Sequence, residues 1–217
     1  MKTLIPYIKI WKIFSTDSFN SNEFILIEEE ITSDEILVRY IFSDDFKNKL
    51  VKAESVITKE LLGPLRGGTS LQREKYCDEQ KCYKLGNLIP KKELVGFLVF
   101  KKIDFEKVKN EFILSKDNEI EQKLIDAFIK ATPLDENFNL LDFNKTRITI
   151  KTKGNPSHAD IIYIKPKLIP EESNIYEKPN TIIRSFSKKM YLMSKLILID
   201  NKRSNFEIQK KFREYFE

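Results

Sequence analysis

Residues 94–101, Leu-Val-Gly-Phe-Leu-Val-Phe-Lys, restrict the fold more than any other stretch of this chain. Every residue before Lys101 is either apolar or glycine. A short, uninterrupted apolar run is typical of a strand covered on both faces, because a half-exposed strand alternates apolar and polar residues. We therefore predict a sheet that has other elements packed against both of its sides.

Four further segments have the composition of strands. Residues 35–42 are rich in β-branched and aromatic side chains, and residues 23–30 begin apolar and end in three glutamates. Residues 147–152 alternate in polarity, and residues 159–165 follow the turn-forming sequence Gly-Asn-Pro-Ser. We expect the last two segments to be the arms of a β-hairpin.

Helical periodicity marks other parts of the chain. We expect a helix from Asp104 to about residue 114, and a second that begins at an Asn118–Glu121 capping box and ends at Pro133. A third helix is predicted around residues 186–197, and a fourth after a Ser204–Glu207 capping box. Residues 46–62 fit either a short helix or a strand. The apolar stripes of these helices are Phe105, Val108 and Phe112; Ile120, Leu124, Phe128 and Ile129; Phe186, Met190, Met193 and Ile197; and Ile208, Phe212 and Phe216.

The fold class predicted from these patterns is α+β, with one domain built on a mixed or antiparallel sheet flanked by helices. The length of 217 residues suits one domain, or one domain with an appendage. We expect an α+β core in residues 1–165 and a proline-containing connector in residues 166–180. Residues 181–217 are expected to form basic amphipathic helices that pack on or near the core.

The net charge of +5 is concentrated at one end of the chain. Residues 181–217 contain nine basic and four acidic residues, which accounts for the whole excess. Such a segment favours a nucleic acid or another anionic partner, although a solvated helix face has the same composition. The residues expected to contact a partner are Lys188, Lys189, Lys195, Lys202, Arg203, Lys210 and Lys211.

His158 is the only histidine, and it lies where a turn enters the predicted strand 159–165. Histidine titrates near neutral pH, so any imidazole acid–base role must belong to this residue. Asp160 lies on the same strand face and can orient the ring. The candidate catalytic residues are therefore His158 and Asp160. A structural role, with His158 capping the turn, explains the same pattern.

A glycine-rich stretch precedes the first cysteine. Half of the six glycines lie in residues 63–70, where small residues are flanked by Arg66 and Arg73. Backbone amides and guanidinium groups arranged in this way can hold a phosphate or carboxylate. The candidate anion-binding residues are Arg66, Gly67, Gly68, Ser70 and Arg73. A plain flexible turn is the alternative interpretation, because neither a P-loop nor a dinucleotide-binding motif is present.

Two cysteines, Cys77 and Cys82, leave three interpretations open. They can be free thiols in local contact, a redox pair, or part of a metal site. A structural zinc site needs four ligands, and two cysteines with one histidine fall short of that number. We expect no metal site and no cofactor.

Several classes of protein are excluded by the residues that are missing. One histidine cannot form the His-Glu-x-x-His metalloprotease motif, and the zinc-deaminase and protein-kinase signatures are absent. The composition does not exclude a nuclease that holds its metal through carboxylates. No apolar run approaches the roughly 20 residues that span a bilayer, and the N-terminus lacks a signal-peptide pattern. We expect a cytoplasmic protein without membrane contact.

The stretch from about Arg66 to Ile161 resembles a group of small bacterial proteins to which no activity is attached. The shared parts are the glycine-rich segment with Ser70 and Arg73, the Tyr76-Cys77 pair, the apolar strand, and an Asn-Pro-(Ser/Ala)-His-Ala-(Asp/Glu)-Ile segment at residues 155–161. The resemblance covers under half of the chain. It implies a role near mobile-element or defence genes and supplies no catalytic residues.

Two functions from different classes follow from these observations. The first is an accessory or interaction subunit of a bacterial multi-protein system, such as anti-phage defence. It would bind a protein partner encoded nearby, or a nucleic acid, through its basic C-terminal helices. The second is an enzyme acting on a phosphate-bearing substrate, in which Arg66 and Arg73 hold the anion and His158 with Asp160 transfers protons. Convergence of these residues in one cleft would favour the enzyme.

Overall fold

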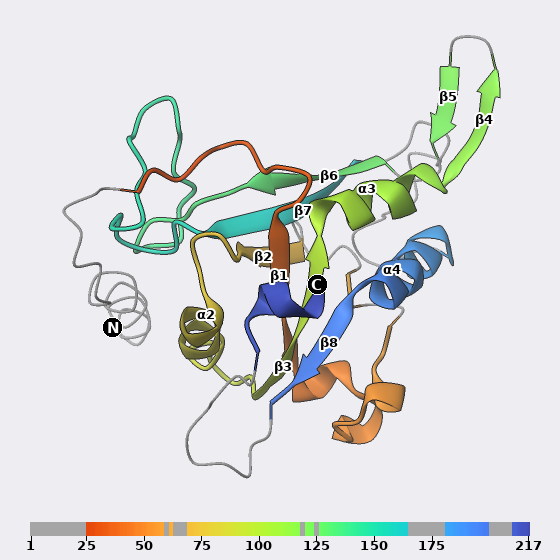
Figure 1. The fold of residues 1–217 in the computed structure, drawn as a ribbon, viewed down its shortest axis with the longest axis horizontal. Helices are drawn as coiled ribbons and strands as arrows, with labels where there is room; N and C mark the ends of the chain where they lie inside the picture. Colours follow the sequence, from red (N-terminus) through yellow and green to blue (C-terminus); the bar gives the residue numbers. More distant parts are fainter. Residues whose placement is uncertain are drawn as a thin grey trace.

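The sheet at the centre of the fold is antiparallel throughout. The computed structural model describes residues 25–58, 61–62, 69–117, 120–123, 126–164, 181–199 and 210–217. Within these residues six strands pair in the order β6-β7-β2-β1-β3-β8 (Figure 1). Their bounds are β1 Ile36–Phe42, β2 Thr69–Arg73, β3 Leu94–Lys101, β6 Asp126–Ala131, β7 His158–Ile164 and β8 Lys195–Leu198.

Three α-helices and a two-stranded ribbon complete the described part of the fold. The helices are α2 Glu79–Gly86, α3 Lys102–Asn110 and α4 Thr181–Met193. The ribbon consists of β4 Ile113–Asp117 and β5 Ile120–Lys123, and it projects away from the sheet (Figure 1). The result is a single α+β domain, as the sequence predicts.

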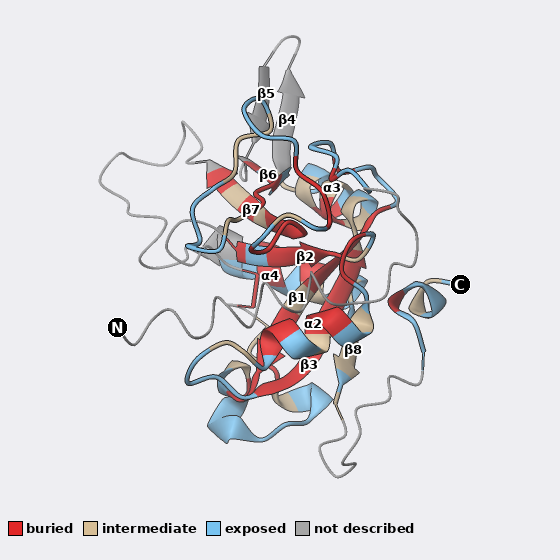
Figure 2. Ribbon diagram, turned by 90° about the vertical axis from the view of Figure 1, so that its left-hand side faces the viewer, coloured by how far each residue is buried: buried red, intermediate tan, exposed pale blue. Residues whose placement is uncertain are grey.

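Both faces of the middle strands are covered, which confirms the prediction from residues 94–101. On one face Leu37 and Phe100 belong to a core that also contains Phe105 from α3 and Phe186 from α4. On the other face Val38, Tyr40, Phe97 and Val99 pack with α2 and with a 3₁₀ turn, η4, that spans Phe212–Tyr215. Strand β3 is accordingly buried along nearly its whole length (Figure 2).

Gly96 explains how β8 comes close to β3. A Cβ atom at Gly96 would lie only 2.4 Å from the carbonyl oxygen of Ile197, so any larger residue would push the two strands apart. The helical pattern that ends at Ile197 predicts one helix here. The structure instead ends α4 at Met193 and begins β8 at Lys195.

The predicted hairpin of residues 147–152 and 159–165 is wrong in its first arm. Strand β7 pairs with β6 on one side and β2 on the other. Thr149 forms only an isolated bridge with Leu26, and residues 25–30, predicted as a strand, form no other pairing. Ile27, Ile148 and Ile150 instead pack into a small separate cluster, which explains their apolar character.

The helix predicted to end at Pro133 is also wrong, because β5 and β6 occupy that region. In β6 the buried residues Ala127, Ile129 and Ala131 alternate with the exposed Phe128 and Lys130, a period of two. The short apolar run fitted a helix stripe equally well, and pairing with β7 decides the outcome.

The helix expected from Asp104 starts earlier and ends sooner. It begins at Lys102 and ends at Asn110, and the Asp104 carboxylate accepts a hydrogen bond from the Lys101 backbone N–H at 3.4 Å. Residues 46–56 contain short 3₁₀ turns and one bridge between Phe46 and Val56. The capping box at Ser204 lies outside the described residues.

Candidate functional site

The turn before His158 is fixed by close backbone contacts. Gly154 has a φ of +110°, and a Cβ atom there would lie 2.2 Å from the carbonyl oxygen of Leu134. The next residue, Asn155, exchanges two backbone hydrogen bonds with Leu134, at 2.8 and 3.0 Å. Glycine is therefore required at position 154. The turn places His158 at the first position of β7.

Ser157 ties the same turn to strand β2. Its hydroxyl donates to the Gln72 side-chain oxygen at 2.7 Å, and its carbonyl accepts from the Arg73 backbone N–H at 2.9 Å. Ser157 is fully buried. These contacts hold Gly154, Asn155 and Ser157 in place and so fix where His158 enters β7.

His158 is held from one side of its ring. Nδ1 lies 3.0 Å from the carbonyl oxygen of Thr132 and 2.9 Å from the Thr132 hydroxyl. That hydroxyl also donates to the Asp160 carboxylate at 2.8 Å, and Asp160 Oδ2 is 3.7 Å from Nδ1. Asp160 thus lies beside the imidazole, as the shared strand face predicts, and Thr132 connects the two.

This arrangement selects the protonation state of the neutral ring. A carbonyl oxygen can only accept a hydrogen bond, so Nδ1 must carry the proton that Thr132 receives. Nε2 then keeps its lone pair, and it forms no hydrogen bond with the part of the chain that the structure describes. The arrangement can accept a proton at Nε2 while Asp160 stabilises the resulting imidazolium.

Burial opposes that positive charge. It lowers the pKa of His158 below its ordinary value of 6.5, and the nearby Asp160 carboxylate and the Thr132 carbonyl offset part of the effect. The side chain is about 10% exposed. Burial therefore favours the neutral imidazole over the imidazolium.

We expect nitrogen NMR of the imidazole to show the Nδ1–H form and a pKa below 6.5. The chain contains one histidine, so the signal needs no assignment. Replacing Asp160 by asparagine removes the charge that favours the imidazolium, so the pKa of His158 should fall further in Asp160→Asn. A ring protonated on Nε2, or a pKa at or above 6.5, would contradict this geometry.

The same shift makes folding pH-dependent. A histidine whose pKa is lower in the folded state binds fewer protons than it does in the unfolded chain. Its contribution to stability is therefore complete above pH 6.5 and is lost as the pH falls from there through the folded-state pKa. Urea unfolding at several pH values should show this loss in the wild type and a smaller one in His158→Gln.

Two rows of side chains surround His158 on one face of the sheet. Register places Lys130, Asp160 and Ser70 opposite one another on β6, β7 and β2. Gln72 lies opposite His158 in the next row. Ser70 therefore lies on the same sheet face as His158, as the enzyme hypothesis requires. Lys130 is an exposed cation on this face, and the sequence analysis missed it because it lay in a predicted helix.

Arg73 does not join this group. Side chains alternate along β2, so Arg73 projects to the face opposite Ser70 and Gln72. Its guanidinium is fully buried and pairs with Glu35 through Nε at 2.5 Å and Nη2 at 2.9 Å. It also donates to the backbone carbonyls of Glu28 and Glu30. Its donors are thus bound to the protein itself.

The remaining anion-binding candidates, Arg66, Gly67 and Gly68, lie outside the described residues. The segments that flank them meet β7 away from His158. Leu62 accepts a hydrogen bond from the Tyr163 hydroxyl, and Thr69 pairs with Ile161. The structure therefore does not bring Arg73 to His158, and it leaves the position of Arg66 open.

The basic residues of the C-terminal segment occupy several elements. Lys188 and Lys189 are exposed on α4, Lys195 begins β8, and Lys210 and Lys211 precede η4; Lys202 and Arg203 lie outside the described residues. Lys189 forms an ion pair with Glu111, the residue that follows α3. Met190 and Phe186 on the other side of α4 are fully buried in the core.

The two cysteines are free thiols in contact. Cys77 and Cys82 are both fully buried, and their sulfur atoms are 3.4 Å apart. Burial raises the pKa of Cys82 well above its ordinary value. Among the described residues, no three His, Cys, Asp or Glu side chains are grouped so that they could hold a metal ion.

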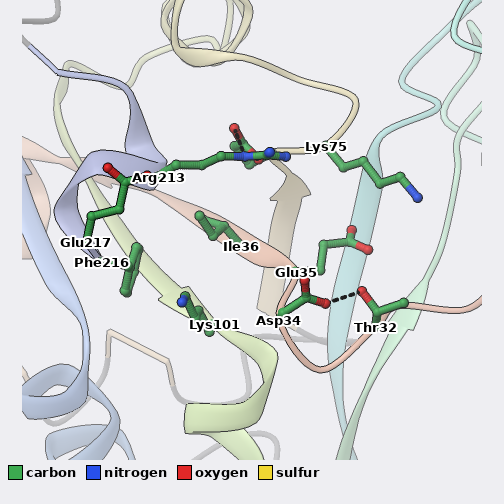
Figure 3. A pocket seen from close by; sticks show the side chains of 10 residues that line it. Thr32, Asp34, Glu35, Ile36, Lys75, Lys101, Arg213, Phe216 and Glu217 are labelled. Carbon is green, nitrogen blue, oxygen red and sulfur yellow. Dashed lines mark hydrogen bonds and ion pairs between the residues drawn. The ribbon is translucent and has the colours of Figure 1, made fainter.

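A second candidate site is a cavity at the end of the sheet where β1 begins and β3 ends (Figure 3). Its volume is about 380 Å³. Charged side chains of both signs surround an apolar floor, and part of its wall is the C-terminal turn. Sequence reasoning missed this cavity, because its lining residues come from four separate parts of the chain and form no motif.

Neither known protein families, nor curated proteins, nor solved structures contain a match to this chain. In the described part of the chain, no helix combines the length and the apolar character needed to cross a bilayer.

Proposed function

We propose that this protein is a binding subunit of a multi-protein system and that it docks an acidic, extended segment of a protein partner along β8 and α4. One observation carries the proposal. The last strand of the described sheet, β8, is an open edge flanked by exposed lysines and exposed apolar side chains.

The main chain of β8 has hydrogen-bonding groups to offer. Ile199 donates its backbone N–H to the carbonyl of Val95 at 2.9 Å. The odd-numbered residues of this segment therefore direct their backbone N–H and C=O groups toward β3. In an antiparallel strand the intervening residues direct their N–H and C=O groups to the other side. The main chains of Leu196 and Leu198 therefore point away from the sheet, where an added strand can pair with them.

Exposed apolar side chains lie next to this edge. Leu192 is 71% exposed at the end of α4, Met193 is 43% exposed, and Leu198 in β8 is 38% exposed. Large aliphatic side chains gathered near an open strand favour a protein partner over a nucleic acid, because nucleic-acid surfaces present phosphates and stacking bases.

The charge of this surface selects an acidic partner. Helix α4 contains three basic residues and no acidic one, and Lys195 opens β8. Lys189 is paired with Glu111, whereas Arg184, Lys188 and Lys195 are exposed to solvent. Opposite charge on the partner would raise the rate of association and fix its orientation on the edge.

The arginine-held phosphate site is not part of this proposal. It requires Arg73 to face His158, and Arg73 is instead engaged by Glu35 on the other side of β2. The anchored imidazole keeps its capacity to accept a proton, and the NMR measurement described above tests that capacity.

The proposal can be tested with synthetic peptides. We expect a fluorescein-labelled peptide of alternating glutamate and valine to bind the full chain, and to bind more tightly than one of alternating lysine and valine. Reversing two charges in Lys188→Glu/Lys195→Glu should weaken the acidic peptide at least about tenfold at low salt, and added salt should reduce the difference. Fluorescence anisotropy measures both affinities.

A matched variant separates local contact from net charge. Lys145→Glu/Lys151→Glu changes two exposed lysines by the same total charge in the segment between β6 and β7, at the other edge of the sheet, and it should bind the acidic peptide as the wild type does. Equal binding of both peptides would contradict the proposal. So would a wild type that ignores the peptides and binds a 20-nucleotide single-stranded DNA through the same lysines.

A further inference from the structure

We propose that the cavity beside the C-terminal turn binds an α-amino acid with an apolar side chain. This inference is independent of partner docking on β8. It rests on the placement of charged side chains of both signs around an apolar floor, in a volume of about 380 Å³. Ligand cavities for small molecules begin at roughly this size.

The anionic end of the ligand would be held by Arg213 and Lys101. Arg213 contacts both Glu74 carboxylate oxygens through Nε, at 3.1 and 3.2 Å. Its terminal amino groups form no hydrogen bond within the described residues, and the side chain is 62% exposed. Glu74 therefore orients the guanidinium while leaving its outer fork open for a carboxylate.

Lys101 is the second cation of the cavity. Its ammonium group lies 5.4 Å from the centre of the Phe216 ring and forms no ion pair with the described residues. Both Lys101 and Arg213 help to lower the pKa of Asp34, although the hydrogen bond from Thr32 is the largest cause. Lys101, Arg213 and Asp34 all line the same cavity (Figure 3).

Asp34 would hold the cationic end. Its Oδ1 accepts the Thr32 hydroxyl at 2.8 Å, and the side chain is exposed at the cavity. No ion pair joins Asp34 to Lys101 or Arg213, so a gap of more than 4.0 Å separates the carboxylate from each cation in the wall of one cavity. A molecule that has an ammonium and a carboxylate on one carbon can bridge that gap.

The floor of the cavity selects the rest of the ligand. Ile36 is buried at the back, and the ring of Phe216 forms one wall (Figure 3). An aliphatic or aromatic side chain placed against them would remove apolar surface from water. The structure therefore favours apolar amino acids over small charged ones.

Three related probes test the two ends of the ligand separately. L-phenylalanine has both charges, 3-phenylpropionate lacks the ammonium, and 2-phenylethylamine lacks the carboxylate. We expect saturation-transfer NMR and isothermal titration on the full chain to show L-phenylalanine binding at least about tenfold more tightly than either analogue. That factor corresponds to the loss of one charge-assisted hydrogen bond.

Two variants assign each end to its residue. In Arg213→Gln the advantage of L-phenylalanine over 2-phenylethylamine should disappear, and in Asp34→Asn its advantage over 3-phenylpropionate should disappear. Glu214→Gln, an exposed neighbour outside the cavity, should bind like the wild type. Wild-type affinity in both cavity variants, or no binding of L-phenylalanine at millimolar concentration, would overturn the proposal.

Discussion

Replacing Arg73 by alanine is expected to lower the free energy of unfolding by about 3–5 kcal/mol. The guanidinium is completely buried, and the Glu35 side chain that it contacts is only 3% exposed. Removing one partner of such a pair leaves the other as an uncompensated charge in the interior, which is the costly case. Urea unfolding followed by circular dichroism measures the loss.

Arg73 also connects three parts of the chain, so its replacement should lower the free energy of unfolding by more than the loss of one ion pair would. It donates to the carbonyls of Glu28 and Glu30, and its guanidinium lies 4.8 Å from the centre of the Tyr76 ring. Tyr76 in turn accepts the backbone N–H of Glu28. Lysine cannot reproduce this planar set of donors, so Arg73→Lys should recover only part of the stability.

A double variant distinguishes the ion pair from the carbonyl contacts. In Arg73→Met/Glu35→Leu the stranded charge is gone, so the double variant should be more stable than Arg73→Ala alone. It should not reach the wild type, because the carbonyls of Glu28 and Glu30 stay without their donor. Arg147→Ala, an exposed arginine, should change stability by less than about 0.5 kcal/mol. A loss below about 1 kcal/mol for Arg73→Ala would contradict this account.

Replacing Phe186 by alanine is expected to cost about 3–5 kcal/mol, the range measured for large aromatic residues in cores. Phe186 is fully buried and makes edge-on contacts with three rings. Their centres lie 5.6 Å away in Phe105, 5.7 Å in Phe112 and 6.2 Å in Tyr163. The substitution would remove the contacts of this ring with Phe105, Phe112 and Tyr163 and leave a cavity behind.

The same variant shows whether the C-terminal segment folds together with the sheet. Hydrogen exchange of Phe186→Ala should lose protection in α4 and in the strands beneath it, because Phe186 and Tyr163 belong to one core. Leu192→Ala on the same helix should have little effect, since that side chain is 71% exposed. Loss of protection confined to α4, with the strands unchanged, would instead identify residues 181–217 as an appendage.

The sequence predicted those strands in which the composition of a few consecutive residues indicates that they are buried. The apolar run of residues 94–101 required cover on both faces, and α2, α3, α4 and η4 supply it. The strand within residues 35–42 and the strand that begins at His158 were located by composition and by the turn before them. These signals are local, because each depends on a few consecutive residues.

Pairing and partners could not be predicted in this way. The segment containing Phe128 and Ile129 has a helical stripe and a strand alternation at once, and only β7 beside it selects the strand. The sequence placed a single histidine on a strand next to an aspartate. It gave no sign that Thr132, the residue after β6, would hold that ring.

By itself, then, the sequence determined an α+β domain with a doubly covered strand and a turn that delivers His158 to a strand end. The tertiary structure decided what the charged residues do. Arg73 follows glycines and looks like an anion holder, but contacts with residues about 40 positions earlier make it a buried structural cation. Burial follows from the composition of a short segment, whereas the partner of a charge depends on which distant segments the fold brings beside it.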